Sequence, residues 1–200
     1  MVTRSGKVLA AAVPLGMLAS GVLIWQASYA AFSATTTNPN NTFSAGTVTL
    51  TDNRQPSSVM FTPSGLKPGS TGSACIKVTY SGSLAANVKM YLAAADLTTS
   101  SSTNLAQYLT IQVDEGSGTA TNCSDFASTG VLYNPTGAGD LTKTLSAFST
   151  ASGAFGSGVG SISAPTTTTK TYKITYWLQD NSAAAGMNST AKFTWEAQNT

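Results

Sequence analysis

Apolar and polar side chains alternate with a period of two along most of the chain beyond residue 42, and this alternation predicts β-strands. Phe43, Ala45, Val48 and Leu50 belong to the first expected strand. In the later strands, the apolar residues that share one face are Ile76, Val78 and Tyr80, then Val88, Met90 and Leu92, then Leu109, Ile111 and Val113, then Tyr172, Ile174, Tyr176 and Leu178, and last the inward-facing Phe193, Trp195 and Ala197. A further short strand is expected at residues 58–62. Strands at this spacing predict an all-β fold, an antiparallel β-sandwich with a jelly-roll-like order, or with an Ig-like order as the alternative.

Helical signals are few and short. Asp140 precedes Leu141, Leu145 and Phe148, and a cap followed by apolar residues at this spacing predicts a short helix. Residues 97–105 are a weaker helical segment because they are mostly polar. The sequence therefore predicts one or two short helices, and it predicts a long loop at residues 151–169, which are rich in Gly, Ser and Thr.

The first thirty residues have the layout of a secretory signal peptide. Arg4 and Lys7 precede an uncharged, largely apolar stretch over residues 8–25, and small residues follow up to Ala30. A positive start, an apolar middle and small residues before the cut define such a peptide, so we expect cleavage between Ala30 and Ala31. The alternative is a retained membrane anchor, because the stretch approaches the length of about 20 residues that spans a bilayer.

Charge and composition exclude several classes of protein. Charged residues make up 9% of the chain and apolar residues 42%, which argues against a disordered segment. No basic stripe indicates nucleic-acid binding. Removal of Arg4 and Lys7 with the leader leaves eight basic and eight acidic side chains, a net charge of zero. A neutral surface lacks the repulsion that keeps copies of a protein apart, so self-association becomes easier.

Chemical motifs are sparse in this sequence. The chain has no histidine, which removes the commonest general base and the commonest metal ligand. The adjacent carboxylates Asp114 and Glu115 would face opposite sides of a strand and cannot act as a pair. We therefore predict no catalytic, cofactor-binding or metal-binding residues. Tyr91, Tyr108 and Trp177 are expected on outward faces, and a contiguous patch of them would suggest a site for a sugar or a partner.

Two cysteines, Cys75 and Cys123, are expected to form a disulfide, because an exported protein meets an oxidising environment. Cys75 lies on the strand face opposite to Ile76, Val78 and Tyr80. The disulfide would therefore hold the loop around Cys123 against the outside of the sheet or its edge.

Five short sequences occur in the same order as in one known family. They are Ala30-Ala31-Phe32-Ser33 at the expected cleavage point, Phe-Ser-Ala-Gly-Thr-Val-Thr-Leu at residues 43–50, Gly-Leu-Lys-Pro-Gly at 65–69, Gly-Ser-Leu at 82–84 followed by Val88-Lys89, and Phe-Thr-Trp-Glu-Ala-Gln at 193–198. Together they resemble the TasA/camelysin family of bacterial exoproteins, which are cut by a SipW-type signal peptidase. The resemblance covers both ends and most of the first half, but not residues 95–170.

The resemblance implies two different functions. TasA-like members are structural subunits of extracellular biofilm fibres with a jelly-roll fold, and camelysin-like members are described as cell-surface metallo-endopeptidases. The lack of histidine and of a zinc motif speaks against carrying over the protease activity. We therefore expect a secreted, non-enzymatic fibre subunit without a cofactor. The metallo-endopeptidase and a monomeric adhesin or carbohydrate-binding module remain as alternatives.

The fibre interpretation also implies an assembly mechanism. In TasA-like fibres the N-terminal segment of one subunit is thought to complete a sheet in the next, so the partner is a second copy of the chain. Here that assembly strand would comprise Ala31, Phe32, Ser33, Ala34 and Thr35, within a donor strand and hinge at residues 31–42 that precede a sandwich domain at 43–200. Burial of Phe32 in a pocket would contribute about 2 kcal/mol. The signal peptidase is the processing partner, and only the uncut leader would contact a membrane.

Overall fold

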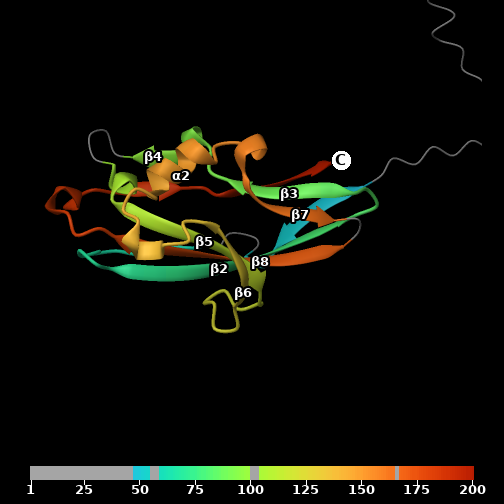
Figure 1. Ribbon diagram of the computed structural model, residues 1–200, viewed down its shortest axis with the longest axis horizontal. Coiled ribbons are helices and arrows are strands. Elements are labelled where there is room, and N and C mark those ends of the chain that lie inside the picture. Colours follow the sequence, from blue (N-terminus) through green and yellow to red (C-terminus); the bar gives the residue numbers. More distant parts are fainter. Residues whose placement is uncertain (1–46, 55–58, 100–103, 165–166) are drawn as a thin grey trace, which may run out of the picture. The chain divides into compact units, whose positions relative to one another are not determined.

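The computed structural model describes residues 47–54, 59–99, 104–164 and 167–200 (Figure 1). The expected signal peptide at residues 1–30 lies outside the described residues, and so does the expected donor strand and hinge at 31–42. The cleavage site and the assembly strand therefore stay predictions.

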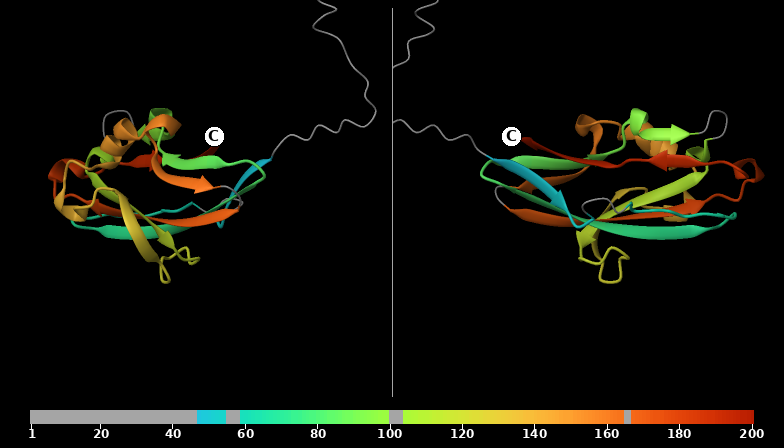
Figure 2. Two further views of the ribbon diagram at one scale, coloured as in Figure 1. Left: turned by 45° about the vertical axis from the view of Figure 1, so that its right-hand side comes forward. Right: turned by 180° about the vertical axis from the view of Figure 1, so that it is seen from behind.

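Two layers of antiparallel strands form the fold, as the views of Figure 2 show. The larger sheet has five strands in the order β1 (Val48–Asp52), β2 (Thr71–Gly82), β8 (Thr168–Leu178), β5 (Leu109–Ser117) and β6 (Ala127–Tyr133). The smaller sheet has the order β10 (Thr194–Asn199), β3 (Ala86–Tyr91) and β7 (Val159–Ala164), and β4 (Leu97–Thr99) pairs with β9 (Ser189–Ala191). The prediction of an all-β antiparallel sandwich is confirmed.

Helical segments are short and lie in the connections. Among the described residues the α-helix is α2 (Leu145–Ala151), and the single turns of 3₁₀ helix are η1 (Ala94–Asp96), η2 (Leu105–Gln107), η3 (Gly137–Gly139), η4 (Phe155–Ser157) and η5 (Ser182–Ala184). The weaker helical segment predicted at residues 97–105 contains β4 and the first residue of η2 instead.

The order of the strands is jelly-roll-like. β2 pairs with β8 in the larger sheet, and β3 pairs with β7 in the smaller sheet. Because β3 follows β2 and β8 follows β7 along the chain, the two pairs form one long antiparallel ribbon that passes from one sheet to the other. In the Ig-like alternative the last strand pairs with the strand that directly precedes it, within the same sheet. Here the last strand, β10, pairs with β3.

The alternation of side chains places the core between the sheets as expected. Tyr80, Val88, Met90 and Tyr172 have no exposed surface, and Val78 is 1% exposed. Each such apolar side chain contributes roughly 1.5–3 kcal/mol through burial. The expected inward faces of β2, β3, β5 and β8 are thus confirmed.

The long loop predicted at residues 151–169 is wrong, because β7 (Val159–Ala164) lies within it. β7 pairs with β3 with a register irregularity between Val88 and Met90. Gly160 has a φ of 76°, a left-handed conformation that glycine adopts without steric cost. Gly160, Ser161 and Ser163, which suggested a loop, therefore form a strand, because β3 supplies its hydrogen-bond partners.

The short helix near Asp140 exists, but it begins later than predicted. Thr144 is the N-cap of α2, and its side chain accepts a hydrogen bond from the Ala147 N–H. Asp140 instead stabilises a turn, since Thr142 donates to its Oδ1 from both the backbone N–H (3.1 Å) and the hydroxyl (2.6 Å). Leu141 lies before the helix and is 57% exposed. The strand predicted at residues 58–62 is also wrong over its described part, 59–62, which forms a connection without strand pairing.

Candidate functional site

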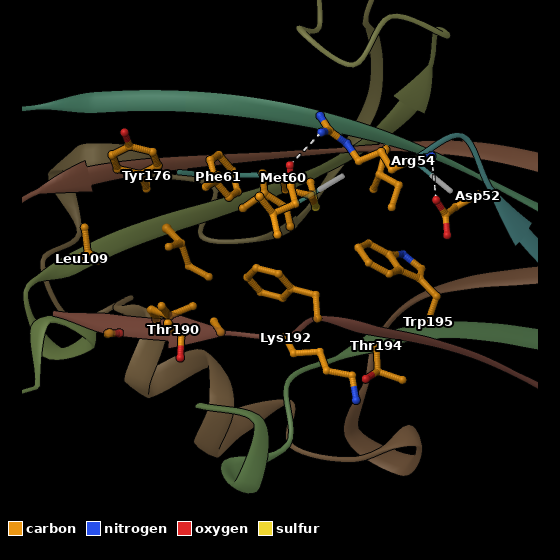
Figure 3. A pocket seen from close by; sticks show the side chains of 18 of the residues that line it. Asp52, Arg54, Met60, Phe61, Leu109, Tyr176, Thr190, Lys192, Thr194 and Trp195 are labelled. Carbon is orange, nitrogen blue, oxygen red and sulfur yellow. Dashed lines mark hydrogen bonds between the residues drawn. The ribbon is translucent and has the colours of Figure 1, made fainter. Parts of the chain in front are cut away.

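A cavity of about 920 Å³ lies between the two sheets, near their edge strands β1 and β10 (Figure 3). Its lining is mostly apolar and comes from β1, the connection after it, the middle of the larger sheet, Leu145 of α2 and the segment from β9 to β10. The side chains used below are Leu50, Met60, Phe61, Ile76, Ile174, Tyr176, Ser189, Ala191, Phe193 and Trp195. We call this cavity the cleft. It is larger than the cavities of one or two water molecules that are usual in a packed core.

One wall of the cleft is the segment from Ser189 to Trp195, all seven residues of which line the cavity. We call this segment the stripe. At about 3.3 Å per residue in extended chain, the stripe is about 20 Å long. The expected inward direction of Phe193 and Trp195 is confirmed, but both are only partly buried.

The opposite wall combines the larger sheet with the connection that follows β1. Phe61 packs edge-on against Tyr176 of β8, with ring centroids 5.5 Å apart and an interplanar angle of 82°. Met60 lies beside Phe61 in this wall (Figure 3). The sequence pattern of residues 58–62 did not show that Met60 and Phe61 line a cavity, because these residues lie in a connection and not in a strand.

Arg54 fastens this connection to the larger sheet. Its Nε donates to the Cys75 carbonyl (2.8 Å), its Nη2 to the Thr121 carbonyl (2.8 Å) and its Nη1 to the Val59 carbonyl (3.2 Å). Burial lowers the pKa of the guanidinium, and the Asp52 carboxylate opposes that shift. The guanidinium therefore joins the wall of the cleft to the loop that carries Cys123.

The disulfide between Cys75 and Cys123 is confirmed, with the two Cα atoms 5.2 Å apart. Cys75 is 1% exposed although it lies on the outward face of β2, because the loop around Cys123 covers it. The Cys75 N–H also donates to the Thr121 carbonyl at 3.0 Å. The predicted position of the loop, against the outer side of the larger sheet, agrees with Figure 1, where it projects below that sheet.

Two strand edges border the cleft. Among the described residues, β1 pairs only with β2, and β10 pairs only with β3. β1 and β10 approach each other across the sandwich, and their residues Leu50 and Ala197 pack against the same buried cluster around Tyr80. An edge strand presents a row of backbone N–H and C=O groups that can pair with an additional strand.

Besides Thr51, Thr190 and Thr194, the polar groups of the cleft fall into two sets. Asp52, Arg54 and Lys192 supply charge, and Lys192 lies 3.6 Å from the Asp96 carboxylate. The second set is buried: within the described part of the chain, the Ser189 Oγ and the Trp195 Nε1 have no hydrogen-bond partner. The indole of Trp195 is packed against Tyr172, with ring centroids 5.7 Å apart.

The three aromatic residues expected on outward faces do not form one patch. Tyr91 lies in the smaller sheet, where its hydroxyl donates to the Glu196 carboxylate at 2.7 Å, and this bond raises the pKa of Tyr91. Tyr108 packs against the cluster of Leu105 and Leu178, whereas Trp177 is in the larger sheet. Their positions give no basis for a shared sugar-binding face.

The adjacent carboxylates Asp114 and Glu115 have separate partners. Gln112 donates to Asp114 at 2.8 Å, and Lys170 forms an ion pair with Glu115 at 2.6 Å. Over the described ranges, no group of three or more His, Cys, Asp or Glu side chains could hold a metal ion. In the same part of the chain no helix is long and apolar enough to cross a membrane.

No protein-family model matches the chain, and no curated protein matches it. The resemblance to the TasA/camelysin family therefore stays a prediction from the short sequences quoted above.

Proposed function

We propose that this protein is a secreted structural subunit of an extracellular biofilm-matrix or surface fibre, and that its cleft accepts the N-terminal strand of the next copy. The proposal gives the protein no catalytic role. The observation that carries it is the cleft itself, an apolar cavity of about 920 Å³ between two strand edges. Strand addition at such an edge combines backbone hydrogen bonds with pockets for alternate side chains.

Residues 31–37, Ala-Phe-Ser-Ala-Thr-Thr-Thr, match the cleft in length and chemistry. Seven extended residues span about 23 Å, close to the stripe of about 20 Å from Ser189 to Trp195. The segment carries no charged side chain, and Phe32 is its one large apolar residue. Phe32 would therefore enter the cleft between the aromatic side chains of Phe61 and Phe193.

The disulfide and the charge of the chain agree with this proposal. A structural disulfide is compatible with an extracellular protein, because such bonds persist in oxidising environments. A mature chain with zero net charge presents little electrostatic repulsion to a second copy. Cleavage after Ala30 would also free the donor strand, so the uncut precursor should not polymerise.

Electron microscopy of the mature chain, beginning at Ala31, tests the proposal. We expect filaments, and we expect the chain that begins at residue 38 to stay monomeric in light scattering. The buried residues of the four clusters in the described part all lie between residues 76 and 184, so the shortened chain keeps its core.

A point variant gives a sharper test than the deletion. Phe32→Ala removes the apolar anchor and leaves the length of the donor unchanged, so filaments should be lost or greatly reduced. Thr37→Ala is the matched control and should assemble normally. Filaments formed equally well without residues 31–37 would overturn strand donation, and a mature protein that stays monomeric at high concentration would overturn the fibre function.

A further inference from the structure

In the part of the chain that the structure describes, Asp52 is the only acidic residue that lines the cleft. It follows Leu50 by two positions on β1, so both side chains face the interior of the sandwich. Its register partner on β2 is Val78, which is 1% exposed. A carboxylate on the inward face of an edge strand is unusual, because removing a charge from water is costly unless an opposite charge or hydrogen-bond donors compensate.

The Asp52 carboxylate can accept a further donor in addition to its present partners. Its Oδ1 accepts a hydrogen bond from the Arg54 N–H at 2.7 Å, and an ionised carboxylate has about four acceptor positions. The cationic side chains of the cleft are held by other groups. Arg54 donates to three backbone carbonyls, and Lys192 lies 3.6 Å from the Asp96 carboxylate. Asp52 is therefore the group of the cleft that suits a positively charged end of an occupant.

The donor strand carries one such charge, and cleavage creates it. Residues 31–37 have no charged side chain. Cutting the bond after Ala30 converts a neutral amide into the α-amine of Ala31. With a pKa of about 7.7–8.0, an α-amine is mostly protonated at neutral pH. The mature strand thus differs from the same strand in the precursor by a single positive charge at its first residue.

The position expected for Phe32 brings this amine close to Asp52. When Phe32 lies beside Phe193, the α-amine is about 5 Å further along the extended strand. Trp195 is two residues beyond Phe193, about 7 Å along the stripe. Asp52 and Trp195 lie at the same end of the cleft on opposite walls (Figure 3), and Trp195 packs against the cluster that contains Val78. The amine therefore reaches the end of the cleft where Asp52 lies.

We propose that the Asp52 carboxylate binds the α-amine of the incoming strand and thereby fixes its direction. Residues 33–37 then run towards Ser189, so the strand lies antiparallel to the stripe. This inference rests on the proposed function, because it assumes that the N-terminal strand occupies the cleft. It adds a second reason why processing precedes assembly: cleavage frees the strand and also makes the ammonium group that the cleft recognises. The ion pair in turn compensates the carboxylate on the inward face of β1.

Calorimetric binding of three synthetic peptides to the chain that begins at residue 38 tests this inference. The first comprises residues 31–37 with a free α-amine, the second is the same peptide with an acetylated amine, and the third comprises residues 28–37. All three have an amidated C-terminus. The first should bind about tenfold more tightly than either of the others, the equivalent of about 1.4 kcal/mol.

The same measurement on two variants assigns the effect to Asp52. Asp52→Asn removes the charge and keeps an oxygen atom that can accept from the Arg54 N–H, and in this variant acetylation should no longer weaken binding. Asp180→Asn is the matched control, because Asp180 is exposed and does not line the cleft. In that control the tenfold difference between the free and acetylated peptides should remain.

The outcomes separate this inference from the proposed function. Equal affinity of the free and acetylated peptides for the wild-type chain would overturn recognition of the amine and leave the strand-acceptor function standing. This comparison needs no substitution, so it decides the question whatever Asp52→Asn does to stability. A tenfold effect that persists in folded Asp52→Asn would overturn the role of Asp52. Tight binding of the peptide that begins at residue 28 would overturn the requirement for cleavage, and no binding of any peptide would overturn the strand-acceptor function itself.

Discussion

The two parts of the sandwich interior differ in how they are closed. At one part, α2 covers the space between the sheets, and Phe148 packs edge-on against Tyr133 with ring centroids 4.9 Å apart and has no exposed surface. At the other part, Phe61, Phe193 and Trp195 border a cavity of about 920 Å³. Both parts use the same apolar residue types on alternate positions, but only the first is filled by the described residues.

The difference indicates that the segments connecting the strands, and not the strands themselves, decide whether the space between the sheets is filled. α2 inserts Phe148 into the interior beside Met90 and Leu92, and its Leu145 also lines the cleft. On the open side, the connection with Met60 and Phe61 forms one wall of the cleft without filling it (Figure 3). Substitutions in the closed part should therefore affect the stability of the monomer, and substitutions in the cleft should affect assembly.

Phe148→Ala should give the largest effect on the closed part. It removes a fully buried aromatic ring and should lower the free energy of unfolding by about 3–5 kcal/mol. Urea denaturation followed by circular dichroism measures the change. A loss below about 1 kcal/mol would contradict the view that α2 closes a tightly packed core.

Removal of the disulfide by Cys75→Ser with Cys123→Ser should have the next largest effect, a loss of about 2–4 kcal/mol. The Arg54 guanidinium bonds to the carbonyls of Cys75 and Thr121, so the wall of the cleft should loosen as well. Hydrogen exchange of residues 59–62 should then become faster. Unchanged exchange in this wall would show that Arg54 does not transmit the effect of the disulfide.

Phe61→Ala should separate assembly from stability. Phe61 is only partly buried, so we expect a loss of about 1 kcal/mol in monomer stability but a marked loss of filaments. Thermal melting and electron microscopy on the same sample compare the two effects. A stability loss as large as that of Phe148→Ala would remove the distinction between the two parts of the interior.

The substitution Glu196→Gln should have the smallest effect on stability, and this effect should depend on pH. Hydrogen bonds from Gln198 and Tyr91 lower the pKa of the Glu196 carboxyl below its ordinary value of 4.5. Its stabilising contribution is therefore present above that ordinary value and is lost as the pH falls through the lower pKa of the folded state. Glu196→Gln should lower the melting temperature at pH 7 by only about 1 °C, because the site is largely screened by solvent.

The difference between Glu196→Gln and the wild type should shrink between pH 7 and an acidic pH below the lowered pKa of the folded state, where the wild-type carboxyl is protonated. Differential scanning calorimetry at the two pH values measures it. A wild-type advantage that grows as the pH falls would contradict the assigned direction of the pKa shift.

The alternation of side chains could be read directly from the sequence because it depends on neighbouring positions alone. Successive residues of a strand face opposite sides, so the inward positions Ile76, Val88 and Ile174 followed from pattern. The outward face of Cys75 followed in the same way, and with it the position of the disulfide loop. These features made the sandwich and its cross-link predictable.

The tertiary structure alone decided the rest. β7 (Val159–Ala164) is a strand because β3 pairs with it, although its one glycine and two serines have little tendency to form strands. Thr144 and not Asp140 begins α2, because the packing of Leu145 and Phe148 fixes where the helix can start. The cleft brings Phe61 beside Tyr176 and across from Trp195, residues that are far apart along the chain. Local patterns determine which face of a strand is apolar, but only the pairing of distant segments determines which apolar faces stay uncovered.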